Sequence, residues 1–122
     1  MNTISSSFSS IGQALANLFE KIKNFVVKVI KRVINFFQDV VNWVKQLHLN
    51  PEEHTPFIVD AEKLKEMIHN APVVDCGIFT GVYNEQTEEI EHYQEISAEG
   101  MDENTQKILS QAKENNPIVV LN

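Results

Sequence analysis

The sequence contains few of the residues that cross-link a chain or interrupt regular structure: one cysteine, four glycines and four prolines in 122 residues. A single cysteine, Cys76, cannot form an internal disulfide, which fits a reducing compartment. The first residues lack the basic and apolar pattern of a secretory signal, so we expect a cytoplasmic protein, with peripheral attachment to a membrane as the alternative. Because no proline or glycine lies between Gly12 and Pro51, nothing predicts a bend there.

The sequence also lacks the motifs of most enzymes and metalloproteins. It has no glycine-rich phosphate loop, nucleophile elbow, dinucleotide fingerprint or calcium-loop pattern. Its four histidines do not have the paired spacing of a metal site, although Glu52 and Glu53 lie between the first two; they are His48, His54, His69 and His92. We therefore predict no catalytic residue, no cofactor and no metal, and interpret Cys76 as a small buried hydrophobe.

The charge is divided unevenly along the chain. The net charge is −7, yet residues 1–49 carry +4 and residues 50–122 carry −11. An acidic C-terminal part argues against nucleic acid as a partner, because phosphates need cationic neutralisation. We interpret its run of carboxylates as a solvated acidic face.

Residues 8–49 have the apolar periodicity of one long amphipathic helix. On a helical projection the polar side chains occupy about 140° and the apolar ones most of the remainder. Such a helix would be about 60 Å long, whereas a domain made of the remaining residues would be only about 25 Å across. Its own chain could not bury this apolar face, so the pattern predicts an external partner.

Two groups of residues follow from this interpretation. The predicted protein interface comprises Leu15, Leu18, Ile22, Phe25, Val26, Val29, Ile30, Val33, Phe36, Phe37, Val40, Trp43, Val44 and Leu47. The basic residues that could meet anionic lipid head groups are Lys21, Lys23, Lys28, Lys31, Arg32 and Lys45. A transmembrane span is disfavoured, because the most apolar twenty residues, 25–44, include four charged ones.

The predicted function is therefore non-enzymatic. We expect an attachment or assembly protein whose helix mediates homo-oligomerisation, contact with a protein partner, or binding to a membrane surface. Homo-oligomerisation ranks first, because the apolar face is wider than a surface-lying helix can submerge. The alternative is a membrane-disrupting, toxin-like or bacteriocin-like helix masked by a fused acidic domain.

Residues 50–122 are predicted to form a separate small acidic α+β domain after a connector at residues 48–56. The pattern indicates a helix at 61–70, a strand at 73–83, a hairpin turn at 84–87, a strand at 89–97, a helix from about 102 to 115 and a strand at 118–121. This α-β-β-α-β order predicts a three-stranded mixed sheet with helices on one face. The second strand is expected at the sheet edge, with Glu89, Glu91, Tyr93 and Glu95 solvated.

Overall fold

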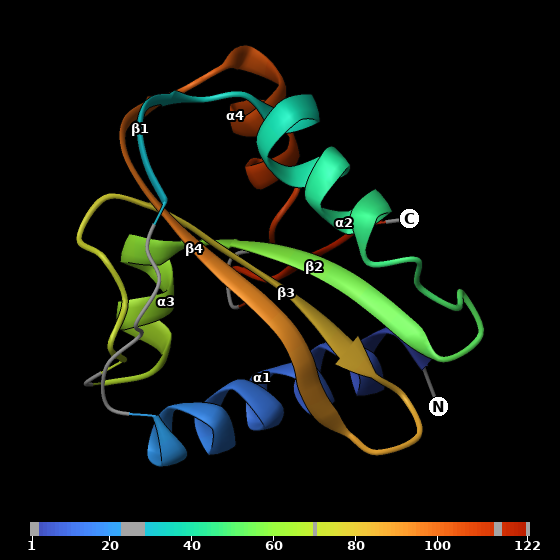
Figure 1. Cartoon of the computed structure of the whole chain (residues 1–122). Helices are drawn as coiled ribbons and strands as arrows, with labels where there is room; N and C mark the ends of the chain where they lie inside the picture. Colours follow the sequence, from blue (N-terminus) through green and yellow to red (C-terminus); the bar gives the residue numbers. More distant parts are fainter. Residues whose placement is uncertain (1–2, 23–28, 70, 114–115, 122) are drawn as a thin grey trace.

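The structure, a computed structural model, describes residues 3–22, 29–69, 71–113 and 116–121, with the backbone alone for residues 3–9. Within these residues the chain forms an α+β fold around a five-stranded mixed sheet (Figure 1). The strands are β1 (Val29–Ile34), β2 (His54–Asp60), β3 (Gly77–Asn84), β4 (Glu89–Met101) and β5 (Val119–Val120). The helices are α1 (Thr3–Lys21), α2 (Asn42–Gln46), α3 (Ala61–Met67) and α4 (Glu103–Leu109), with a π-helix, η1, at Phe36–Val41.

The strand order is β1-β4-β3-β2-β5, with β1 parallel to β4 and the other neighbours antiparallel. Helices cover both faces of the sheet: α1 and α3 lie on one side, and η1, α2 and α4 on the other (Figure 1). Every residue of the central strand β3 is consequently buried. The prediction of three strands with helices on one face is wrong, because it did not include β1 or β2.

The predicted helix over residues 8–49 is also wrong. Helix α1 ends at Lys21, and after residues 23–28, which lie outside the described part of the chain, Val29–Ile34 form a strand. Strand β1 pairs with β4 from Val29↔Ile96 to Ile34↔Met101. Its β-branched residues favour a strand, and this partner lies too far along the sequence for local periodicity to reveal it. Among the described residues, no helix has the length and hydropathy needed to cross a bilayer.

Strand β1 ends at Ile34 although no glycine or proline follows it closely in the sequence. Hydrogen bonds at this point mark the end of the strand. The Asp102 amide donates to the Ile34 carbonyl at 2.8 Å, and Asp102 Oδ2 accepts from the Phe36 amide at 3.2 Å. Asn35 then begins η1: its Oδ1 accepts from the Gln38 amide at 3.0 Å, while its own amide donates to Asp39 Oδ2 at 2.8 Å. This reciprocal arrangement is typical of a helix N-terminus. Residues 35–39 are therefore a boundary, not the interior of a helix.

The two faces of the sheet have separate cores. On one face Ile11, Leu15 and Phe19 of α1 pack with residues of α3, β2 and β3, and the Phe19 ring meets Phe79 edge-on at 5.7 Å. On the other face Ile34, Phe36 and Val40 pack against Ile58, Ile78, Ile96 and Leu109. Both cores thus combine residues from before and after the predicted connector.

Several predicted elements of the C-terminal part are confirmed with different bounds: β4 is longer than predicted, and the two helices and β5 are shorter. The confirmed elements are helix α3, the β3–β4 hairpin, helix α4 and strand β5. The predicted connector, however, includes the start of β2, which runs between β3 and β5. At Gly81 the backbone of β3 lies close to β2, because a Cβ there would lie 2.7 Å from the Phe57 ring.

The predicted edge position of β4 is wrong, because β4 lies between β1 and β3. Glu95, expected to be solvated, is only 1% exposed and accepts a hydrogen bond from the Val74 amide. The segment around Val74 brings this residue a hydrogen-bond donor that the alternation along β4 could not show.

Candidate functional site

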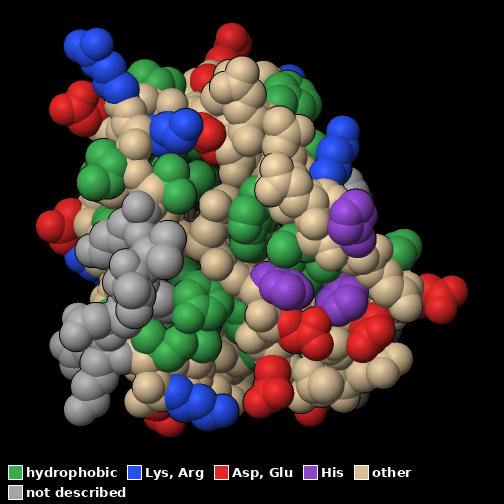
Figure 2. All heavy atoms as spheres, in the orientation of Figure 1, with side chains coloured by type: hydrophobic (Ala, Val, Ile, Leu, Met, Phe, Trp, Pro, Cys, Tyr) green, Lys and Arg blue, Asp and Glu red, His purple; other side chains and the backbone are tan. Residues whose placement is uncertain are grey.

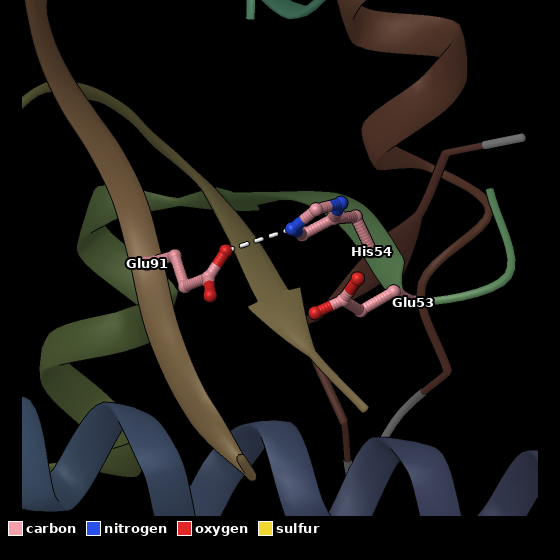
Figure 3. A group of neighbouring side chains, drawn as sticks. All are labelled: Glu53, His54 and Glu91. Atoms are coloured by element: carbon pink, nitrogen blue, oxygen red, sulfur yellow. Dashed lines mark hydrogen bonds and ion pairs between the residues drawn. The ribbon is translucent and has the colours of Figure 1, made fainter. Parts of the chain in front are cut away.

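The only group in the described part of the chain with potential metal-ligating geometry comprises Glu53, His54 and Glu91 (Figure 3). One ligand atom from each residue lies within 4.8 Å of the others. Glu53 immediately precedes β2, His54 begins it, and Glu91 belongs to β4, so the group spans the intervening strand β3. In Figure 2, histidine side chains gather beside acidic ones on the visible face of the molecule.

A β-bulge in β4 brings Glu91 to this group. Val82 pairs with His92, but Tyr83 pairs with Ile90, so Glu91 is the additional residue of the bulge. In an unbroken alternation Glu91 would share the face of Tyr93, whose ring stacks on Phe79 at 5.9 Å. The bulge redirects the side chain, and Glu91 instead contacts His54 and Asn84.

Asn84, fully buried at the end of β3, holds the two carboxylates in place. Its Nδ2 donates to Glu53 Oε1 at 2.9 Å and to Glu91 Oε1 at 2.7 Å. Its Oδ1 accepts from the amides of Gln86 and Thr87 at 2.8 and 2.9 Å. One side chain therefore joins the start of β2, the bulge of β4 and the hairpin turn. We call Asn84, Glu53, His54 and Glu91 the polar cluster.

The hydrogen bonds of His54 define its tautomer. Nδ1 accepts from the Asn50 amide at 3.0 Å, so the proton of the neutral ring lies on Nε2, which is 2.7 Å from Glu91 Oε2. A histidine ligand normally has the opposite arrangement, with a bare nitrogen on the metal and an N–H donated elsewhere. Here the nitrogen facing the carboxylates is the protonated one. The polar cluster thus connects β2, β3 and β4 through side-chain hydrogen bonds. It does not have the protonation pattern of a metal site.

The polar cluster shifts the ionisation of Glu91. Partial burial alone would raise the pKa of this carboxyl, but hydrogen bonds from His54 and Asn84, with the electrostatic effect of the nearby His54 and His92, outweigh it and lower the pKa below its ordinary value of 4.5. A lowered pKa stabilises the fold above the pKa of the unfolded chain, and this stability is lost as the pH falls through the folded-state pKa. Asp102, at the start of α4, behaves alike: burial would raise its pKa, yet hydrogen bonds from Thr105 and Phe36 lower it.

We expect Glu91→Gln to reduce the loss of stability on acidification. Glutamine has no carboxyl to protonate, so this variant should be less stable than the parent near neutral pH and lose less stability between about pH 6 and pH 3. Urea unfolding across this range provides the measurement. Glu99→Gln, an exposed position on the same strand, is the matched control and should retain the parental slope. Equal slopes for the parent and Glu91→Gln would contradict the assigned role of Glu91.

The predicted interface residues do not form one continuous face. Leu15, Phe36 and Val40 are buried, and Leu18, Ile22 and Val29 pack against the cores. Trp43, Val44 and Leu47 are half-buried, whereas Ile30, Val33 and Phe37 are exposed. Phe25 and Val26 lie outside the described residues. Most of the apolar pattern that predicted an external partner is therefore satisfied within the fold.

The basic residues proposed to meet lipid lie on three different elements. Lys21 of α1 is 3.8 Å from Glu89, and Lys31 of β1 is 3.3 Å from Asp39. Arg32 and Lys45 are exposed on β1 and α2. Lys23 and Lys28 lie outside the described residues. The single cationic arc that the helix would have presented is not formed by the described members.

Three large exposed apolar residues belong to the edge strand β1 and to η1, which follows it. Ile30 and Val33 of β1 are 80% and 53% exposed, and Phe37 of η1 is 58% exposed. Tyr93 is the one other large exposed hydrophobic side chain among the described residues. No described strand pairs with the outer edge of β1. We call Ile30, Val33 and Phe37, with the flanking cations Lys31 and Arg32, the β1 surface.

Cys76 is exposed, so its interpretation as a buried residue is wrong. Strand β3 begins only at Gly77, whose φ of 145° no side-chain-bearing residue adopts easily. Cys76 therefore precedes the strand, where the predicted inward and outward alternation does not apply.

Comparison with known proteins gives no relative from which a function could be transferred. No protein-family model matches the chain, and neither a curated protein nor a solved structure is significantly similar to it.

Proposed function

We propose that this protein is a non-enzymatic attachment protein that binds its partner through the β1 surface. The observation that carries the proposal is the exposure of Ile30, Val33 and Phe37 at a sheet edge where no described strand follows. An open edge strand favours the addition of another strand, because its free N–H and C=O groups can continue the ladder of hydrogen bonds. Exposed apolar residues on that strand add contacts that the new strand would bury.

The charges on β1 favour an acidic partner over a second copy. A two-fold antiparallel pairing of β1 with itself would bring Lys31 and Arg32 close to their own equivalents, and like charges across strands are destabilising. Lys31 already contacts Asp39, while Arg32 is exposed. Ile30 and Arg32 share one face of β1, and Lys31 and Val33 share the other. An extended segment that carries both an apolar and an acidic residue on each face would match these positions.

This proposal predicts that Val33→Asp weakens binding about tenfold or more, the equivalent of about 1.4 kcal/mol. The probe is a synthetic peptide that repeats the pattern valine-glutamate-glutamate-valine, and its affinity is measured by NMR titration with the β1 amides as reporters. Aspartate removes an apolar contact and repels the glutamates. Raised salt should also weaken this binding, since the attraction between exposed charges is screened.

Asn35→Asp is the matched control, because aspartate introduces the same charge two residues later and can still cap η1 by accepting from the Gln38 amide. It should bind the peptide more tightly than Val33→Asp does. Equal loss in both variants, or equal binding of a valine–lysine peptide, would contradict the proposal. Light scattering of the parent in peptide-free buffer tests the alternative: an oligomer that Val33→Asp converts to monomer would identify the partner as a second copy.

A further inference from the structure

An apolar groove lies on the opposite side of the sheet from α1, at the end where β5 forms the edge. It is a groove of about 330 Å³ between η1, α2, α4, β2 and β5. Its apolar lining includes Phe36, Val44, Ile108, Val119 and Leu121. None of the three exposed apolar residues of the β1 surface contributes to it.

The one charged side chain that lines this groove is cationic. Lys45 and Gln111, both exposed, are its polar side chains, and no acidic residue lines it, although the chain has 17. Among the described residues, Lys45 makes no ion pair. An apolar recess beside an uncompensated ammonium group is complementary to a molecule that carries an alkyl chain and a negative head.

We propose that the groove binds a single-chain carboxylate amphiphile, such as a free fatty acid of medium length, with its alkyl chain on the apolar lining and its carboxylate at Lys45. The volume is at the lower end of the range for ligand pockets, about 300 to 1,000 Å³, which suits one chain and not a partner helix. Gln111 can donate a hydrogen bond to the same carboxylate. The proposal is independent of the β1 surface.

The chain contains its own reporter for this site. Trp43, the only tryptophan, is half-buried on α2 and immediately precedes Val44, which lines the groove. Titration with laurate below its micellar concentration should give a saturable change in tryptophan fluorescence, with one ligand bound per chain by calorimetry. Dodecanol should bind more weakly, and dodecyltrimethylammonium more weakly still, because Lys45 attracts the carboxylate and repels the cation.

Lys45→Glu tests the assignment of the head-group site. Charge reversal should weaken laurate binding about tenfold or more, and should leave dodecanol binding nearly unchanged. Lys107→Glu, an exposed cation of α4 outside the groove, makes the same change in net charge and should bind laurate like the parent. Val44→Asp, which puts a charge in the apolar lining, should weaken both ligands, with circular dichroism to show that the fold is retained.

Three results would overturn the proposal. The first is the absence of saturable laurate binding, and the second is an equal loss of affinity in Lys45→Glu and Lys107→Glu. The third is binding to vesicles of phosphatidylglycerol that is insensitive to Val44→Asp, without binding of monomeric laurate, which would mean attraction to a membrane surface elsewhere on the protein.

Discussion

Asn84→Ala is expected to lower the free energy of unfolding by about 2 to 4 kcal/mol. The side chain is fully buried and makes four hydrogen bonds, two of them to carboxylates. Alanine would leave Glu53 and Glu91 facing each other without their shared donor. It would also remove the acceptor for the two turn amides, although water can reach those because Gln86 and Thr87 are exposed.

Asn84→Asp separates the two halves of this role. Aspartate retains the acceptor for the turn amides but adds a third carboxylate beside Glu53 and Glu91. Its stability deficit should be at least as large as that of alanine near neutral pH, and should shrink as the introduced carboxyl becomes protonated in acid. Urea unfolding near neutral pH and in acid is the measurement, with Gln86→Ala in the same turn as the control. A deficit below about 1 kcal/mol for Asn84→Ala would show that the polar cluster contributes little to stability.

The sequence predicts the hairpin that contains Asn84, because its turn residues are local, but it does not predict the polar cluster. Glu53 and His54 reach Glu91 across a whole strand, and only the bulge in β4 directs Glu91 to the correct face. A strict two-residue alternation places Glu91 with Tyr93. Nothing in the local sequence specifies where the register shifts, so the cluster depends on pairing information that one sequence does not contain.

The failure of the long-helix prediction has a different cause. Helical periodicity is present in α1 and again through η1 and α2, and the strand between them contains enough apolar residues to continue the pattern. One local signal was available: Asn35 and Asp39 can cap a helix, which would place a boundary inside the predicted one. The β-branched residues Val29, Ile30, Val33 and Ile34 were a second signal. Together they favour a strand followed by a new helix at this segment, against the helical periodicity.

Deletion of residues 1–49 is expected to abolish cooperative folding of the remainder. The deletion removes Ile11, Leu15 and Phe19 from one core and Ile34, Phe36 and Val40 from the other. At about 1.5 to 3 kcal/mol for each fully buried apolar side chain, the combined loss rivals the entire stability of a typical domain, about 5 to 15 kcal/mol. It also removes β1 from β4, so the fragment would have to expose the buried side of a strand.

Single substitutions in each core measure how much the packing of residues 1–49 contributes to stability, without removing the whole segment. Leu15→Ala and Ile34→Ala, one in each core, are expected to cost about 2 to 5 kcal/mol each, whereas Arg32→Ala at an exposed position should cost much less. The fragment of residues 50–122 should give a poorly dispersed amide NMR spectrum and a broad urea transition. If it instead unfolds cooperatively with a dispersed spectrum, it is an autonomous domain as its composition suggests, and α1 and β1 only cover it. The first outcome would make the basic N-terminal part a structural component, so that attachment through the β1 surface could be tested only in the full chain.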